Sequence, residues 1–198
     1  MPIKDFQNVA HKVISPLITP DTQRDAVRID TSIAEGHNHC KNTSATMMIN
    51  WIGQNYESAK TLAHTGEYSY NASLLGYMQP GEKIQDWPPH VKCINGMLAN
   101  GKIPLQAHFV NFRANYTEVL YSLLCGYPVV LGTMITTSGH IVLLVGLTAN
   151  GDFIIIDPYG EAPNYKNHLA DYNVIPKLLF NHWIDTSCNC IYLKDLIK

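Results

Sequence analysis

The sequence predicts an α+β fold in which helices come first and an antiparallel sheet follows. The stretch from Gly126 to Gly160 contains three apolar runs rich in β-branched residues, whereas the amphipathic helical patterns lie before it. Asn150-Gly151 separates the second run from the third, and this dipeptide favours a tight hairpin turn because both positions need positive φ. The three runs therefore predict neighbouring antiparallel strands in the second half of the chain.

Composition limits the classes of protein to which the chain can belong. Its 198 residues, 46% of them hydrophobic, suit one compact domain with a sizeable core. The formal net charge is −2 and no Lys/Arg cluster is visible, which argues against a nucleic-acid or anionic-membrane partner. No run of about 18 apolar residues is present, so we expect no integral membrane segment. We further expect a monomer.

The beginning of the chain predicts an arm rather than a secretion signal. Pro16 and Pro20 bracket it, and its polar residues interrupt any apolar core that a signal would need. We therefore divide the chain into an N-terminal arm, 1–20, and a single domain, 21–198. We expect no signal peptide. The five cysteines are odd in number and their spacing suggests no disulfide framework, which indicates a protein made in a reducing cytoplasm.

A helix over 42–56 is the first strong pattern. Ala45, Met48, Ile49 and Ile52 fall at i, i+3, i+4 and i+7, which puts them on one apolar face. Glycine, proline and asparagine delimit the elements after it. In chain order we expect an extended segment (22–30), a loop (33–39), this helix, a tyrosine-rich loop (66–82), a helix opened by Pro88-Pro89 and stopped by Gly101, a strand (105–110), a helix begun at Asn115 and ended at Gly126, strands (128–135, 140–147 and 153–156), a polar loop (161–173), a short helix (174–183) and a strand (190–193).

Two ionisable residues stand at the ends of the apolar strands. His140 opens the second strand and Asp157 closes the third. A hairpin turn at Asn150-Gly151 brings both residues towards the same end of the sheet. A carboxylate beside an imidazole fixes its tautomer and supports its positive charge. The pair thus predicts acid–base chemistry that lacks only a nucleophile.

Among the five cysteines, Cys40 is the candidate nucleophile. It follows a polar loop and precedes the first helix, and a helix N-terminus stabilises a thiolate through its free N–H groups and partial positive charge. Cys93 and Cys125 lie within helical patterns and are predicted to be buried small apolar residues. Cys188 and Cys190 border the last strand.

Four stretches in the right order resemble papain-like cysteine peptidases of the bacteriocin-leader-peptidase type, and most closely the phage endolysin-like branch. They span roughly residues 22–193. The stretches are Gln23-Arg24-Asp25; His39-Cys40-Lys41-Asn42-Thr43-Ser44-Ala45 with Met47-Met48; Leu124-Cys125-Gly126-Tyr127-Pro128-Val129-Val130 with Gly139-His140; and Asp157-Pro158-Tyr159-Gly160. The resemblance implies a papain-like fold whose nucleophile helix packs on a C-terminal antiparallel sheet.

The resemblance also implies roles for single residues. Cys40 matches the nucleophile, His140 the general base and acid, and Asp157 the residue that orients the histidine. Gln23 matches a glutamine whose amide helps to hold the oxyanion, and Asn38 or the N–H of Cys40 is the alternative donor. Cys-Lys-Asn replaces the Cys-Gly-Pro of many relatives, and the interval between Gln23 and Cys40 is long.

Residues beside these positions are predicted to contact substrate: Asn38, His39, Gly139 and Tyr159. The implied reaction is hydrolysis of an amide bond without a cofactor or metal, and in the endolysin-like branch the substrate is the cross-linking peptide of peptidoglycan. Such an enzyme acts on the cell wall after release from the cell. The alternatives are an acyltransferase, deamidase or effector protease on the same fold, and a non-catalytic binding module.

A zinc-held interaction domain is another interpretation. His37, His39 and Cys40 are close in sequence, and Cys188 or Cys190 would complete a set of zinc ligands. Three ligands within four residues are packed more tightly than the usual structural zinc spacings. We therefore favour loop histidines beside a cleft.

Overall fold

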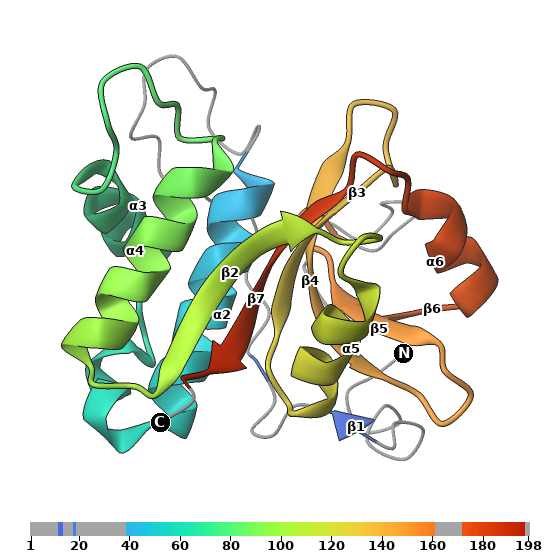
Figure 1. Cartoon of the computed structure of the whole chain (residues 1–198), viewed down its shortest axis with the longest axis horizontal. Coiled ribbons are helices and arrows are strands. Elements are labelled where there is room, and N and C mark those ends of the chain that lie inside the picture. The colour runs from blue at the N-terminus through green and yellow to red at the C-terminus, as the bar shows by residue number, and fades with distance from the viewer. Residues whose placement is uncertain (1–11, 14–17, 19–38, 161–171, 197–198) are drawn as a thin grey trace.

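A computed structural model describes residues 12–13, 18, 39–160 and 172–196 (Figure 1). The segments predicted over 22–30 and 33–38, and most of the loop over 161–173, lie outside the described residues. In chain order the elements are β1 (Lys12–Val13), α2 (Cys40–Asn55), the 3-10 helix η2 (Glu57–Leu62), α3 (Glu67–Leu75), α4 (Trp87–Asn100), β2 (Leu105–Asn111), α5 (Tyr116–Leu124), β3 (Val129–Thr133), β4 (His140–Leu147), β5 (Phe153–Ile156), β6 (Tyr172–Ile175), α6 (Lys177–Trp183) and β7 (Asn189–Asp195).

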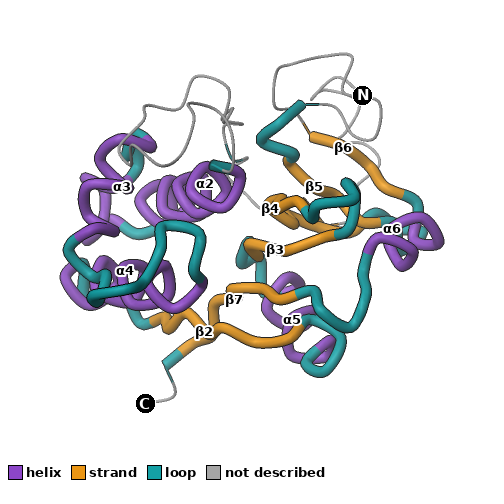
Figure 2. Tube along the Cα trace, turned by 90° about the horizontal axis from the view of Figure 1, so that it is seen from above, coloured by secondary structure: helices purple, strands orange, loops and turns teal. Residues whose placement is uncertain are grey.

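The described strands form one antiparallel sheet in the order β2-β7-β3-β4-β5-β6, and β1 pairs with β4 beside that path. Helices α2, α3 and α4 lie on one side of the sheet, and α5 and α6 lie on the other (Figures 1 and 2). The predicted α+β fold, with helices packed on a C-terminal antiparallel sheet, is confirmed.

Both faces of the central strands are buried, which explains why their sequences are nearly continuous apolar runs. Alternate residues point to opposite faces of a strand. One set packs with α2 and α4: Val130, Leu143, Val145, Ile154 and Ile156. The other set packs with α5 and α6: Val129, Leu131, Val142, Leu144 and Phe153.

Helix α2 lies between α3 and strands β3 and β4 of the sheet, whereas α4 packs directly on β2 (Figure 2). The apolar face predicted from Ala45, Met48, Ile49 and Ile52 is fully buried. The polar side of the helix, which includes Thr46, is buried as well. It is covered by elements such as α3, whose position cannot be predicted from the residue pattern of α2.

The prediction of a loop over 66–82 is wrong in part, because helix α3 forms within this range. Tyr70 and Leu74, one helical turn apart, are buried on its inner face. Polar and tyrosine residues fill the rest of this short helix, so its local apolar pattern is weak. Packing against α2 and α4 stabilises it instead.

Other boundaries differ from the prediction near the end of the chain. The helix predicted over 174–183 starts at Lys177, because Pro176 occupies its N-cap and β6 takes the residues before it. Helix α5 begins after Asn115 as predicted, but the Asn115 side chain donates to the Asn111 carbonyl instead of capping the helix. Cys125, expected to be buried, is exposed because it lies one residue beyond α5.

Part of the predicted arm, 1–20, contacts the domain. Lys12 pairs with Leu147 and Val13 pairs with Gly146, in the last part of β4. Strand β3 pairs with the earlier residues of β4, up to Leu144. Ile18 is buried, and its carbonyl accepts a hydrogen bond from the Tyr172 hydroxyl at 2.6 Å. Within the described part of the chain, none of the helices combines the length and apolar character needed to cross a membrane.

Gly53 is expected to be essential to the stability of the helical half. A Cβ on Gly53 would lie 2.1 Å from the backbone nitrogen of Ala63, so Gly53→Ala forces η2 away from α2. We expect a loss of about 3 kcal/mol or more in the free energy of unfolding, measured by urea denaturation. Gly66→Ala is the matched control, because a Cβ there meets nothing within 4 Å, and its cost should stay below about 1 kcal/mol. Equal losses in the two variants would contradict the close-approach argument.

Candidate active site

The N-terminus of α2 places the Cys40 thiol at the mouth of a cleft. Cys40 is the first residue of the helix and is half-buried. The first helical hydrogen bond runs from the Thr43 N–H to the His39 carbonyl, at 2.9 Å. The N–H groups of Cys40 and of the two residues after it therefore have no partner within the helix. Together with the helix dipole, they make this end of the helix electropositive.

The β4–β5 hairpin holds His140 and Asp157 together. Leu143 pairs with Ile156, so Asp157 lies one step further along, diagonally across from His140. The His140 Nε2 donates to Asp157 Oδ1 at 2.6 Å, and both side chains are buried. The Tyr159 N–H donates to the same oxygen at 2.8 Å. This is the juxtaposition that the hairpin turn predicted.

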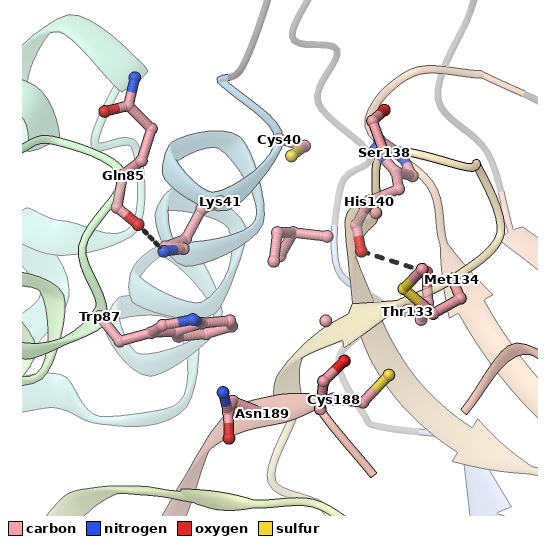
Figure 3. Close-up of a pocket in the computed structure, with 14 residues that line it drawn as sticks. Cys40, Lys41, Gln85, Trp87, Thr133, Met134, Ser138, His140, Cys188 and Asn189 are labelled. Carbon is pink, nitrogen blue, oxygen red and sulfur yellow. Dashed lines mark hydrogen bonds between the residues drawn. The ribbon is translucent and has the colours of Figure 1, made fainter. Parts of the chain in front are cut away.

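Cys40 and His140 meet across the cleft, from opposite sides (Figure 3). Burial alone would lower the pKa of His140, but hydrogen bonds with Asp157 and Cys40 and their negative charges outweigh it and raise the pKa from 6.5 to about 10. Because Nε2 bonds to Asp157, Nδ1 is the ring nitrogen left for the thiol proton. The three residues thus form a connected chain from sulfur to buried carboxylate.

The cleft has a volume of about 370 Å³ and is bordered by α2, the loop before α4, and strands β3, β4 and β7 (Figure 3). Both polar and apolar side chains line it. Its lining residues are Cys40, Lys41, Gln85, Trp87, Gly132, Thr133, Met134, Ser138, Gly139, His140, Ile141, Ser187, Cys188 and Asn189. An open groove of this kind can admit an extended peptide over the thiol.

A second histidine–carboxylate pair anchors the N-terminus of α2. The His39 Nδ1 lies 2.7 Å from Glu67 Oε1, and the Thr43 hydroxyl donates to Glu67 Oε2 at 2.7 Å. All three side chains are buried. Glu67 is the first residue of α3, so it fastens α3 to the turn that carries Cys40.

Lys41 places an ammonium group on the helical side of the cleft. Its Nζ donates to the Gln85 carbonyl and lies 4.1 Å from the centroid of the Trp87 ring. The side chain is only 6% exposed. Burial lowers the pKa of Lys41 to about 8, although the charges of Cys40 and Asp86 act in the opposite direction.

The structure brings some of the other predicted site residues to the cleft and leaves others aside. Gly139 lines it, with φ of +80° that allows the sharp turn into β4. Tyr159 packs edge-on against the His140 ring, with centroids 6.2 Å apart. His39 is buried against Glu67 and is absent from the lining. Gln23 and Asn38 lie outside the described residues.

The sequence did not point to several residues of the cleft. Gln85 lies in the loop before α4 and Trp87 is the first residue of that helix, whereas Ser187 and Asn189 come from the start of β7 and the turn before it. None of them belongs to a motif or a periodic pattern. An indirect signal existed for Lys41 alone, because it directly follows the candidate nucleophile.

The described part of the chain contains no cluster of side chains that could bind zinc. Within it, no three His, Cys, Asp or Glu side chains come together to hold a metal ion. His39 is engaged with Glu67, and Cys190 lies in the core between the sheet and α5. His37 lies outside the described residues.

Comparison with known proteins gives one family. Residues 18–189 match the model of the Peptidase_C39 like family. The match covers Cys40, His140 and Asp157. No curated protein matches the chain.

Glu67 is expected to stabilise the fold through its two buried contacts. Glu67→Ala leaves the His39 ring nitrogen without its acceptor inside the protein, which should lower the free energy of unfolding by about 1–3 kcal/mol in urea denaturation. Glu57→Ala is the matched control, because Glu57 is exposed and its one ion pair among the described residues is with the exposed Lys60, so its effect should stay within about 0.5 kcal/mol. A loss for Glu67→Ala no larger than that of the control would show that the pair does not anchor α2.

The titration of His140 tests the charge arrangement. Its pKa is raised when folded, so the pair stabilises the fold fully below pH 6.5, and this contribution is lost as the pH rises through about 10. In Asp157→Asn the pKa of His140 should fall, as followed by NMR of the imidazole resonances. Asp152→Asn changes a carboxylate of the same hairpin that bonds to the Lys177 N–H, and it should leave the titration unchanged. Equal titration curves in all three proteins would refute the assignment.

Proposed function

Because the chain belongs to the Peptidase_C39 like family, which is a family of cysteine peptidases, we propose that it hydrolyses amide bonds with Cys40 as nucleophile, His140 as general base and acid, and Asp157 as the residue that orients His140. One observation carries the proposal: a thiol at a helix N-terminus meets an imidazole whose far nitrogen is bonded to a buried carboxylate.

The reaction begins with transfer of the thiol proton to the Nδ1 of His140. The Cys40 sulfur attacks the carbonyl carbon and forms a tetrahedral intermediate. His140 then gives its proton to the leaving amine as the C–N bond breaks, and a thioester remains on Cys40. Water attacks the thioester, His140 takes its proton, and the acid product leaves with the thiol restored. Asp157 keeps the imidazole turned and its charge balanced throughout.

The oxyanion of the tetrahedral intermediate needs hydrogen-bond donors. The N–H of Cys40 is one candidate, since it has no partner within α2 and lies beside the sulfur. The side-chain amide of Gln23 is the other, on the basis of its resemblance to the family's glutamine. Loss of one such donor typically costs about 10²–10³-fold in rate.

We propose the cross-linking peptides of peptidoglycan as the substrate. The support is the resemblance of Gln23-Arg24-Asp25 and of the Cys40 helix to the endolysin-like branch. The open groove along the thiol also suits an extended, branched peptide better than an enclosed pocket would. On this proposal the protein acts on the cell wall after its release.

Mass spectrometry of purified muropeptides incubated with the protein tests this function. Wild type should convert cross-linked peptides into fragments that together gain one water per bond cleaved, and Cys40→Ala should reduce the rate by roughly 10⁴-fold or more. Cys125→Ala, which removes an exposed thiol outside the cleft, is the matched control and should remain active.

Added amine separates hydrolysis from acyl transfer. A product that carries the amine instead of water would favour the acyltransferase alternative, whereas release of ammonia with gain of water would favour the deamidase alternative. Alkylation by iodoacetamide separates both from a binding module. Cys40 should react faster than Cys125 well below pH 8, and His140→Ala should abolish that preference. A Cys40 that reacts no faster than Cys125 would overturn the catalytic assignment.

A further inference from the structure

Lys41 is a buried cation for which the proposed reaction has no use. It lies in the first turn of α2, directly after the nucleophile, and its side chain extends along the cleft towards Gln85 above the face of Trp87 (Figure 3). His140 stands on the other side of the same cleft. The two charged groups therefore flank Cys40 from different directions.

The two cations differ in their counter-charges. His140 bonds to Asp157, whereas no carboxylate oxygen of the described residues lies within ion-pair distance of Lys41 Nζ. One ammonium N–H is used by the Gln85 carbonyl and the Trp87 ring supplies its π face. The charges of Cys40 and Asp86 act on the ammonium from a distance, but no carboxylate of the described residues contacts it, so this buried charge is compensated only in part.

The surroundings hold this ammonium in one place. Trp87 is stacked on Phe109, with ring centroids 5.5 Å apart and planes 23° from parallel. Gln85 lies two residues before Trp87, in the loop that leads into α4. An ammonium has three donors, and the remaining N–H groups have no acceptor among the described residues. Because Lys41 lines the cleft, a ligand in the cleft can reach them.

We propose that Lys41 forms an anion-binding subsite that selects peptide substrates carrying a carboxylate within one or two residues of the scissile bond. This inference rests on the proposed peptidase function. The carboxylate is either an acidic side chain or the free C-terminus of the peptide, since both present the same group to the ammonium. Trp87 then holds the ammonium through its ring face and packs against the neighbouring part of the substrate.

A different role for Lys41 would be to stabilise the Cys40 thiolate, because the two charges interact. The two roles predict different results. A thiolate-stabilising cation affects every substrate alike, since each of them is attacked by the same sulfur. A substrate-binding cation affects only substrates that carry the carboxylate, so the ratio of rates for acidic and neutral substrates distinguishes the roles.

The test uses peptides found to be cleaved by wild type and not by Cys40→Ala in a digest of a diverse peptide library. Each cleaved sequence is made in Glu and Gln versions at the positions on both sides of the bond, and with an acid or amide C-terminus. We expect wild type to prefer one carboxylate form over its neutral partner by about 10- to 100-fold in kcat/KM, the range of a hydrogen bond to a charged group.

Lys41→Met should remove this preference, and Lys41→Arg should retain part of it. Lys60→Met is the matched control, since it removes an exposed lysine beyond the far end of α2 and should leave the ratio unchanged. Binding of uncleaved Glu and Gln peptides to Cys40→Ala, with and without Lys41→Met, gives the same comparison without turnover.

Which peptide pair shows the preference identifies the source of the carboxylate. If wild type cleaves the Glu and Gln peptides of each pair at equal rates, and likewise the acid and amide forms, the subsite is overturned and the peptidase function stays in place. A uniform loss over all substrates in Lys41→Met would overturn it in favour of the thiolate role. If wild type cleaves neither a library peptide nor a muropeptide that Cys40→Ala spares, the peptidase function fails and the subsite fails with it.

Discussion

The burial of helix α2 on all sides is the constraint on which the site depends. Twelve of its sixteen residues are buried, including several that are polar. Each of these needs a hydrogen-bond partner, because an unpaired polar group inside a protein costs about 1–3 kcal/mol. Helix α3 supplies Asn71 to Asn42 and Glu67 to Thr43. Cys40 therefore stands at the end of a helix whose position is fixed from the sheet and from α3 together.

The two cationic groups in the cleft differ in their partners. The imidazole of His140 is balanced by Asp157 within the protein, which suits a group that must gain and lose a proton without moving. Among the described residues, the ammonium of Lys41 contacts a carbonyl and an aromatic face but no carboxylate, which suits the anion-binding role proposed for it. Between them lies the Cys40 sulfur. In the two roles that we propose, chemistry and substrate selection would come from opposite walls of one groove.

Local patterns predicted the elements that carry their own signals. The strand from His140 to Leu147 was predicted at its observed bounds, and the helix predicted from Pro88-Pro89 to Gly101 is α4 to within a residue. The failures share a physical cause. Helix α3 and strand β6 are short, and their stability comes from burial against distant elements rather than from propensity. A pattern within one segment does not contain that information.

The sequence by itself determined the α+β class and the pairing of His140 with Asp157, because a hairpin turn between adjacent strands fixes which residues meet. Only the tertiary structure decided that Cys40 faces His140, that Glu67 anchors the helix, and that Lys41 lies over Trp87. These contacts join segments far apart in the chain. Their geometry follows from how helices pack on a sheet, which depends on the whole core and not on the spacing of residues within any one element.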